Sequence, residues 1–481
     1  MIRHRRIPDS LSAPVLMVSP ADSDPQSDRE AIAIFSKAYS ITRTPAVTGK
    51  TRQMFFAILL LASCALGLAQ TAAAQQYRVS YLDSLGGTNS RGNSLNDRGW
   101  IAGFSRLSGD QNRHATLWRN GSPLDLGTLG GPDKNSSVAW PVKNNRGILA
   151  GISQTDTPEP NGETWSCAAF FSGPRRSGFT CLGFRWEAGT MKPLLPLPGG
   201  NNSFATGANN RGQVAGWAEN GVHDATCVGA QVLQFRPVVW GPGTDQIQTL
   251  PLISGDTSGA ATALNDRGQI VGISGVCDQA VGRRTGRHAV LWDNGRAIDI
   301  GNFGVDLWNT AMAINQRGDI VGFAGTDPND LDGNLLRAFI WTRKDGIRAL
   351  DPLPLTGHVF SQANSINERR QVVGVSCTIA GDCLAVLWQG NEMKNLNDLI
   401  VGGFNGVLTN AQDINDQGEI TGRAFDPGSG QLRAFIAVPV SDHGEDIDKR
   451  SNAISPSIVL PENVRQALRR QRGLASGLQL R

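Results

Sequence analysis

The sequence has little of several features that would assign it to a familiar class of protein. Charge of one sign is not in excess: the first 74 residues hold eight of the 45 Lys and Arg and five of the 42 Asp and Glu, so residues 75–481 contain 37 of each. A nucleic-acid-binding protein needs a basic surface that displaces counterions from phosphates. The balanced charge therefore argues against a nucleic-acid partner.

Sequence motifs of catalysis are absent as well. The chain contains no nucleophile elbow, no zinc-binding helix motif, no phosphate-binding loop and no dinucleotide fingerprint. Aromatic residues are few, at 6% of the chain, whereas glycine is abundant, with 57 residues. Because many short strands joined by turns fit this composition better than helices do, we expect an all-β fold.

One octapeptide pattern occurs seven times. Its variants begin at Asn96, Asn144, Asn209, Asn265, Asn315, Asn367 and Asn415, and they read NDRGWIAG, NNRGILAG, NNRGQVAG, NDRGQIVG, NQRGDIVG, NERRQVVG and NDQGEITG. The intervals between them are 48, 65, 56, 50, 52 and 48 residues. Self-similarity at a nearly constant period indicates a repeat architecture, here one large domain of seven repeats.

Each repeat can be divided into four strands. In residues 311–353 we predict strands at 311–315, 319–325, 336–341 and 347–353, with tight turns after the first and third strands. The other repeats carry the same order of apolar and turn residues.

The tight turn after the first strand explains the repeated Asn and Gly. The Asn side chain can bond the backbone of the turn, and Gly three residues later adopts a positive φ without steric cost. The sixth repeat differs, because Arg370 takes the place of Gly, and this should cost about 1 kcal/mol. No ligand is needed to account for the repeated turn residues.

A tryptophan ends the third strand in the first six repeats, at Trp118, Trp186, Trp240, Trp292, Trp341 and Trp388. An aromatic side chain at a fixed place buries ~150–250 Å², which favours packing between neighbouring sheets over ligand binding. His114 and His288 share one position of the same strand, where another repeat has Arg337. The shared position argues against a metal site at these histidines.

The repeats resemble a known family. The combination of LDLGTLGG, the turn pattern INxxGxIVG and the strand RAFxW is similar to the extracellular repeat family called HAF, over residues 78–437. The HAF tripeptide itself is not intact and is replaced by HAT, HAV, RAF and LAV. The resemblance implies export and repetition, and it implies no activity and no catalytic residues.

The two ends of the repeat region match each other. The seventh repeat stops after its third strand, at 432–440, whereas 77–87 resembles a fourth strand but precedes the first repeat. Together these two strands would complete one sheet. We therefore predict a seven-bladed β-propeller of four-stranded antiparallel blades over residues 75–440, closed by the N-terminal strand. The alternative is an open β-solenoid, which would need polar caps at its ends.

The segment before the repeats is typical of an export signal. Residues 54–74 have a positive flank, an apolar run and a small-residue exit, and they are too short for a membrane span. We expect a mature chain that starts near Gln75 in the periplasm or outside the cell. Residues 1–53 precede the signal, which favours a misassigned start codon over a genuine extension. The sequence LASC offers lipid attachment at Cys64 as an alternative to free secretion.

The tail, residues 441–481, changes character. An acidic stretch is followed by LPENVRQALRRQRG, in which Pro461 and Glu462 favour the start of a short helix that ends before Gly473. We expect either a frayed tail or a helix docked on the propeller. Contact of its arginines with an anionic surface is the alternative.

Propeller geometry divides the connections between two faces. Turns after the first and third strands share one face, here called the turn face, whereas the loops after the second strand and the crossings between repeats share the other, here called the loop face. All six cysteines of the mature chain fall in loops of the loop face: Cys167, Cys181, Cys227, Cys277, Cys377 and Cys383. An even number in an exported chain indicates disulfides. Proximity favours 167–181 and 377–383, which leaves 227–277, and a metal site would need a Cys-x-x-Cys spacing that is absent.

Other candidate residues lie in the same loops. Trp165 in the longest loop and Trp308 in a crossing are candidate ligand anchors, although each could simply cover a sheet edge. A turn at 326–334 offers oxygen ligands for calcium at Asp327, Asn329, Asp330 and Asp332. Its spacing departs from the calcium-loop motif, so a solvated acidic turn is favoured. No other cofactor is indicated.

Two functions compete at this stage. A non-catalytic scaffold would bind a protein or glycan on the loop face through Trp165 and Trp308. A polysaccharide hydrolase or lyase would need carboxylates that converge there, and the candidates are Asp306, Asp327, Asp332 and Asp382. We favour binding, because every repeated residue has a structural role. We expect a monomer without a transmembrane span.

Overall fold

The computed structural model describes residues 75–163, 167, 171, 178–227, 231–277, 286–390, 392–440 and 459–469. The expectations for residues 1–53, for the signal at 54–74 with Cys64, and for the acidic part of the tail lie outside these residues. Residues 74–481 form one compact unit, and its described part is all-β apart from a helix, a 3-10 turn and the helical residue Cys167. None of the helical segments described is long and apolar enough to cross a membrane.

Five antiparallel sheets contain four strands each, paired in sequence order. The first comprises β6 (Ser136–Ser137), β7 (Leu149–Pro158), β8 (Phe179–Glu187) and β9 (Thr190–Leu194). The second comprises β10 (Ser203–Ala208), β11 (Val214–His223), β12 (Leu233–Trp240) and β13 (Ile247–Thr249). The third comprises β14 (Ser258–Leu264), β15 (Ile270–Gly275), β16 (Gly286–Asp293) and β17 (Arg296–Asp299). The fourth comprises β18 (Thr310–Ile314), β19 (Ile320–Ala324), β20 (Arg337–Thr342) and β21 (Gly346–Leu350). The fifth comprises β22 (His358–Ile366), β23 (Gln371–Thr378), β24 (Cys383–Gln389) and β25 (Glu392–Asn395).

A sixth sheet has nine strands and contains both ends of the repeat region. One part comprises β2 (Gly86–Leu95), β3 (Ile101–Leu107), β4 (Arg113–Arg119) and β5 (Ser122–Asp125). The other part comprises β27 (Val407–Ile414), β28 (Ile420–Asp426), β29 (Gln431–Pro439), β1 (Tyr77–Tyr81) and β26 (Ile400–Val401), which follows the 3-10 turn η1 (Leu396–Leu399). β1 pairs antiparallel with β29, from Tyr77 opposite Pro439 to Tyr81 opposite Phe435. The N-terminal strand therefore lies beside the third strand of the seventh repeat.

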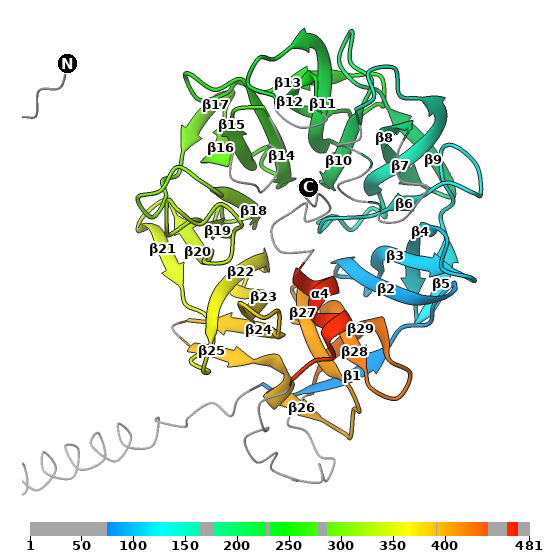
Figure 1. Cartoon of the computed structure of the whole chain (residues 1–481), viewed down its shortest axis with the longest axis vertical. Helices are drawn as coiled ribbons and strands as arrows, with labels where there is room; N and C mark the ends of the chain where they lie inside the picture. Colours follow the sequence, from blue (N-terminus) through cyan, green and yellow to red (C-terminus); the bar gives the residue numbers. More distant parts are fainter. Residues whose placement is uncertain are drawn as a thin grey trace, which may run out of the picture. The chain divides into compact units, whose positions relative to one another are not determined.

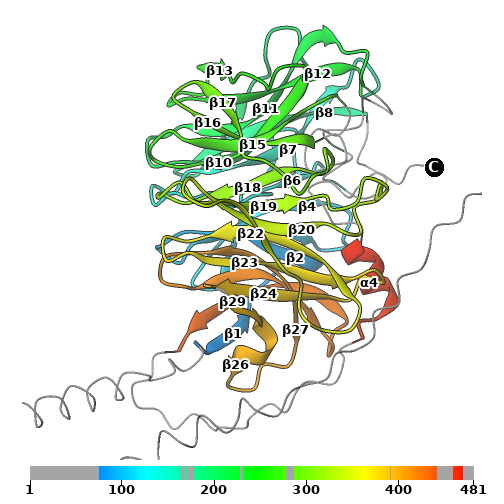
Figure 2. The same ribbon diagram turned by 90° about the vertical axis from the view of Figure 1, so that its left-hand side faces the viewer.

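The sheets are arranged around a common centre as a β-propeller. The first strands of the repeats, β2, β6, β10, β14, β18, β22 and β27, lie nearest the centre (Figure 1). Each group of strands contacts the next, and β2 contacts both β27 and β28. The side view in Figure 2 shows the helix α4 (Glu462–Arg469) at one face of this arrangement.

The repeated asparagines form a series of hydrogen bonds between the sheets. Each Nδ2 donates to a backbone carbonyl of the next repeat at 3.0–3.4 Å: Asn96 to Asn144, Asn144 to Ala208, Asn209 to Asn265, Asn265 to Asn315, Asn315 to Asn367, Asn367 to Asn415, and Asn415 to Asn96. The Oδ1 of the same side chains accepts N–H groups of its own turn, as at Asn265 from Arg267 and Gln269. The Asn residues therefore shape the turn, as predicted, and also join each turn to its neighbour.

The next residue of every turn forms a second series of hydrogen bonds. Its side-chain oxygen accepts the backbone N–H of the corresponding residue in the preceding repeat, and this holds for Asp97, Asn145, Asn210, Asp266, Gln316, Glu368 and Asp416. Each hydrogen bond contributes about 1 kcal/mol. Two hydrogen bonds per junction therefore hold the turn face at a fixed geometry.

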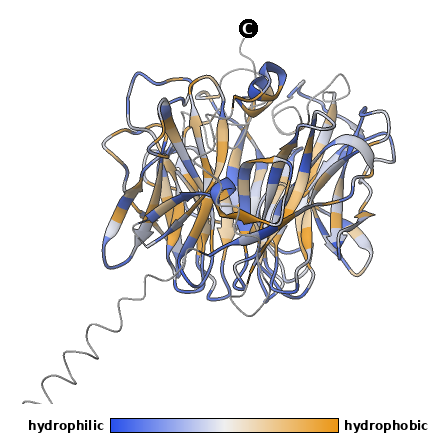
Figure 3. Cartoon of the chain, turned by 90° about the horizontal axis from the view of Figure 1, so that it is seen from below, coloured by the Kyte–Doolittle hydropathy of each residue, from blue (hydrophilic) through white to orange (hydrophobic). Residues whose placement is uncertain are grey.

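The tryptophans that end the third strands pack between sheets, as predicted. Trp118 Nε1 donates to Asp83 O at 2.7 Å, Trp240 Nε1 to Leu195 O at 3.0 Å and Trp292 Nε1 to Pro251 O at 2.6 Å. In each pair the acceptor lies in the crossing from the preceding sheet, just before the first strand of the tryptophan's own repeat. Hydrophobic residues run along the strands and the connections are mainly hydrophilic (Figure 3), so the core lies within and between the sheets.

Strand positions in the fourth sheet match the prediction closely. The predicted first strand at 311–315 is observed at Thr310–Ile314, and the predicted fourth strand at 347–353 ends earlier, at Leu350. The first strand of the second repeat is much shorter, since β6 has only two residues. Pro141 follows in this segment, and a proline has no N–H to donate to a neighbouring strand.

Candidate functional site

Three disulfides stabilise the loop face. They join Cys167 to Cys181, Cys227 to Cys277 and Cys377 to Cys383, which are the pairs expected from the sequence. The second disulfide connects the loop between β11 and β12 to the loop between β15 and β16, and so links two neighbouring sheets. Three disulfides indicate an oxidising environment outside the cytoplasm.

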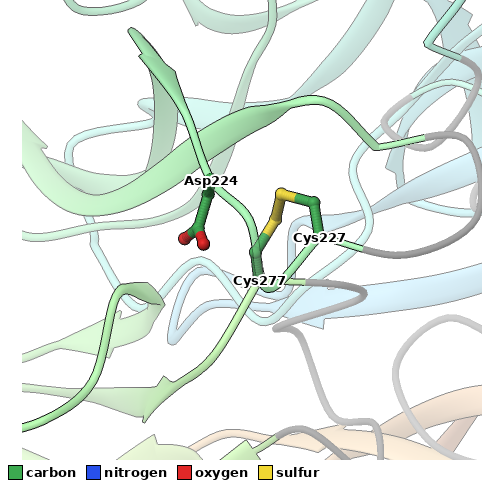
Figure 4. Close-up of side chains that lie close together, drawn as sticks. All are labelled: Asp224, Cys227 and Cys277. Atoms are coloured by element: carbon green, nitrogen blue, oxygen red, sulfur yellow. A yellow bond between two sulfur atoms is a disulfide. The ribbon is translucent and has the colours of Figure 1, made fainter.

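A carboxylate lies beside the second disulfide. Asp224, Cys227 and Cys277 have potential metal-ligand atoms within 4.8 Å of one another (Figure 4). The two sulfurs are bonded to each other, however, and a metal needs a thiolate ligand. Asp224 accepts instead from the backbone N–H and the hydroxyl of Thr226, at 2.8 and 2.7 Å. This cluster is therefore structural.

The structure describes one of the two candidate tryptophans, Trp308. Trp165 lies outside the described residues. Trp308 is 6% exposed, its Nε1 donates to Asp330 O at 3.0 Å, and its ring lies directly against Gly333. Very little of its indole surface can touch a ligand. This geometry corresponds to the alternative weighed for it, in which the side chain covers a sheet edge.

The candidate calcium turn is held by its own backbone. Asp327 Oδ1 accepts the N–H of Asn329 at 2.8 Å, and the two carboxylate oxygens of Asp330 accept the N–H groups of Asn334 and Leu335 at 2.9 and 2.6 Å. Among the described residues, the carboxylates of Asp327, Asp330 and Asp332 do not form a group of potential metal ligands. The geometry is that of a turn stabilised by carboxylates.

The histidines take part in a repeated side-chain pairing with an aspartate, between the third and fourth strands. His114 Nδ1 lies 2.9 Å from Asp125 and His288 Nδ1 lies 2.8 Å from Asp299. Arg337 pairs with Asp351 in the same way. The shared sequence position thus has a shared structural role.

Two glutamates that the sequence did not single out converge beneath the loop face. Gln231 Nε2 donates to Oε1 of Glu163 and to Oε1 of Glu219, at 3.3 Å each. Glu163 also accepts the backbone N–H groups of Val232 and Leu233, both at 2.6 Å. The exposed fractions are 3% for Glu163 and 0% for Glu219. Burial, and after it the charge of Glu163, raise the pKa of Glu219 to about 7.

Four arginines gather where the first and seventh repeats meet. We call Arg91 on β2, Arg106 on β3, Arg113 on β4 and Arg423 on β28 the arginine cluster. Arg106 lies directly opposite Arg113 in the pairing of β3 with β4. The ends of these two strands lead into the loop between them, which places this part of the cluster at the loop face.

Aromatic rings and mutual repulsion define the electrostatics of the cluster. The Arg113 guanidinium lies 4.5 Å from the ring centre of Phe104 and 4.8 Å from that of Phe171, and Arg423 lies 5.7 Å from Phe104. Burial, and then the neighbouring guanidiniums, lower the pKa of Arg113 to about 9 and that of Arg423 well below its usual value. Burial lowers the pKa of Arg91 to about 10. Concentrated, partly desolvated positive charge favours an anionic partner.

The C-terminal helix docks on the same face. Leu460, Val464 and Leu468 pack in one apolar cluster with the Cys377–Cys383 disulfide. The backbone N–H of Leu460 donates to Asp382 Oδ1 at 3.0 Å. Of the alternatives for the tail, the described part corresponds to the docked helix.

No known family model matches the chain, and no curated protein matches it either. Solved structures with a similar fold include the β-propeller domain of the Trilobed protease from Pyrococcus furiosus, with 11% identity over 79% of this chain and 98% of that one and a TM-score of 0.40. YCF48 bound to D1 peptide has 12% identity over 78% and 98%, with a TM-score of 0.39. The gluconolactonase XC5397 from Xanthomonas campestris has 10% identity over 77% and 93%, with a TM-score of 0.32. Their functions differ, and likeness at this level carries no functional argument.

Proposed function

We propose that the chain is an exported, seven-bladed β-propeller that binds an acidic segment of a protein partner on its loop face without catalysing a reaction. In this proposal β1 closes the ring by completing the seventh blade. The pairing of β1 with β29 supports closure, as do the two series of hydrogen bonds that return from Asn415 to Asn96 and from Asp416 to Asp97. The resemblance to extracellular repeats adds support for export to the periplasm or the cell exterior.

The observation that carries the proposal is the arginine cluster. Burial lowers the pKa of Arg91, and burial together with the charges of Arg91 and Arg106 lowers the pKa of Arg113. Arg423 is buried, at 1% exposure, so a partner's carboxylate would reach the half-buried Arg91 and Arg113, relieve the repulsion between them and accept charge-assisted hydrogen bonds. An extended acidic segment suits a site whose charges come from strands of two neighbouring blades.

One observation favours the hydrolase alternative, because two carboxylates do converge. Glu163 and Glu219 share the Gln231 amide, but catalytic carboxylates must touch the scissile bond. At 3% and 0% exposure, with backbone N–H groups as partners, they suit a structural role. A binding scaffold therefore accounts for more of the loop face.

The test is binding of a glutamate-rich peptide by the full chain. Replacing Arg91 and Arg113 by Gln should weaken binding at least about tenfold, because each charge-assisted hydrogen bond contributes about 1.5–3 kcal/mol. The affinity of the unaltered chain should fall as salt rises. Arg296→Gln is the control, since Arg296 is exposed on β17, distant in sequence from the cluster.

A polyuronate chain in the same assay separates a glycan from a protein partner. Tighter, cluster-dependent binding of the polyuronate would assign the site to a glycan and overturn the protein proposal. Equal peptide binding by the double variant would overturn the cluster as the binding site.

A further inference from the structure

Arg370 occupies a backbone conformation that the other repeats reserve for glycine. Its φ is +60°, and the corresponding Gly268, Gly318 and Gly418 have φ values of 84–87°. A side chain in this left-handed region costs roughly 1–2 kcal/mol, so contacts of the side chain must offset this strain. Among the seven repeats, only the sixth lacks glycine at this position.

The Arg370 side chain reaches back to the preceding repeat. Its Nε lies 2.7 Å from Asp319 Oδ2 and its Nη2 lies 3.0 Å from Asp319 Oδ1, a bidentate geometry that fixes the guanidinium plane. Asp319 is 4% exposed and also accepts from Asn315 Nδ2 at 3.1 Å. The guanidinium is therefore held at the junction of two sheets.

This junction contains a cavity on the turn face, which we call the turn-face pocket. Its volume is about 420 Å³, and five cations line it: Arg267, Arg317, Arg343, Lys344 and Arg370. They come from the first turns of three consecutive repeats and from the turn between β20 and β21. A cavity of roughly 300–1,000 Å³ is typical of small-molecule sites.

The charges of the pocket are only partly compensated. Arg370 is paired with Asp319, and Arg343 Nη2 lies 2.7 Å from Asp293. Arg317 approaches Glu368 only to 3.9 Å. In the part of the chain that the structure describes, neither Arg267 nor Lys344 has a carboxylate within ion-pair distance. These two residues and Arg317 are the donors that an anion can engage.

The surrounding face adds to the positive potential. The third position of the turn is an exposed arginine in six repeats: Arg98, Arg146, Arg211, Arg267, Arg317 and Arg369. Without the other residues of the pocket, these six exposed arginines form a solvated surface. Only at the pocket do Arg370 and the pair Arg343 and Lys344 join it, which distinguishes this junction from the repeated background.

We propose that the turn-face pocket binds a sugar that carries one anionic group. Arg267, Arg317 and Lys344 bind the anionic group, and Arg370 borders it in a fixed orientation. Thr342 and Asp345 also line the cavity, where the Thr342 hydroxyl donates to Asp345 Oδ2 at 3.0 Å. The Asp345 carboxylate accepts sugar hydroxyls. The anionic group is a carboxylate, as in a uronic acid, or a sulfate or phosphate ester, because all three accept hydrogen bonds from guanidinium and ammonium groups.

The experiment is calorimetric titration of the full chain with glucuronate, glucose 6-sulfate, glucose 6-phosphate and glucose. At least one charged sugar should bind, and glucose should bind at least about tenfold more weakly. Among the charged sugars, the tightest identifies the anionic group. Equal affinity for glucose, or no binding of any charged sugar, would overturn the proposal.

Two variants locate the site. Arg267→Gln should weaken binding about tenfold through loss of a charged donor. Arg370→Gly restores the repeat residue, and the relief of left-handed strain offsets the lost ion pair with Asp319. It should keep a melting temperature close to that of the unaltered chain while binding more weakly, so lost binding could not be ascribed to unfolding. Arg211→Gln, at the same repeat position as Arg267 but outside the pocket, is the matched control and should bind normally. Unchanged binding by Arg267→Gln and Arg370→Gly would place the sugar elsewhere and refute the assignment.

Discussion

The buried side chain of Glu219 makes the stability of the whole protein depend on pH. Its carboxyl group has 0% exposure and lies near Glu163, and its pKa is raised to about 7. Between the usual value of 4.5 and this value, the folded protein binds a proton that the unfolded chain releases. Such a group stabilises the fold fully at low pH and loses its contribution as pH rises toward 7 and beyond.

We therefore expect the free energy of unfolding to fall by up to about 3 kcal/mol between pH 4.5 and pH 7.5 on account of Glu219. Urea unfolding at both pH values measures this, and Glu219→Gln should remove most of the difference because Gln resembles the protonated acid. Glu392→Gln, on the exposed strand β25, should leave it unchanged. A pH dependence that persists in Glu219→Gln would show that another group is responsible.

Single residues also show what the repeat pattern can and cannot reveal. Arg423 stands where the other repeats have Phe104, Ile152, Trp217, Ile273, Phe323 and Val375, so the anomaly was visible in the sequence. Its neighbours Arg91 and Arg113 come from other strands, and only the folded structure brings them together. The burial of Trp308 was equally hidden, because it depends on the position of Gly333.

Among the elements, α4 depends on a close approach to the disulfide loop between β23 and β24. A Cβ on Gly381 would lie 2.8 Å from the carbonyl oxygen of Arg465, closer than atoms can pack. Gly381 also has a φ of +99°. The lack of a side chain at Gly381 thus permits both the left-handed turn and the close packing of α4.

Gly381→Ala should release α4 from the loop face, because backbone atoms cannot give way to the new Cβ. Hydrogen exchange in residues 462–469 should accelerate, while exchange in the sheets stays slow. Gly357→Ala is the matched control: its φ is +80° but its nearest neighbour would be 3.7 Å away, so it shares the backbone strain without the clash. Protected amides in the helix of Gly381→Ala would contradict this account of docking.

Strands were predictable where their residues follow the repeat. The turn residues and the alternating apolar residues placed the strands of residues 311–353 to within a few positions, because both signals are local. The short length of β6, two residues, was not predicted. Pro141 follows β6 and has no N–H to donate to a neighbouring strand. The hydrogen bond from each Asn to the next repeat was also not predicted, because the sequence of one turn does not indicate which backbone carbonyl of the neighbouring turn lies beside it.

At the scale of the whole molecule, the proposed ring makes the first and seventh repeats neighbours. The arginine cluster exists only because β28 and β2 lie side by side, so the proposed binding function depends on this junction. In an open solenoid the seventh repeat would lie far from the first, and Arg423 would not meet Phe104.

The most direct test of the account is a cross-link between the two ends of the repeat region. Arg78 lies opposite Val438 in the pairing of β1 with β29, and both side chains are exposed. The double variant Arg78→Cys, Val438→Cys should form an intramolecular disulfide under mild oxidation, identified by peptide mapping without reduction. It should raise stability by roughly 4–5 kcal/mol, because it closes a loop of several hundred residues. The pair Ser80→Cys with Val438→Cys, two residues out of register, should link poorly. A closed ring predicts efficient 78–438 linkage, whereas free thiols or links only between molecules would contradict closure and the binding site that rests on it.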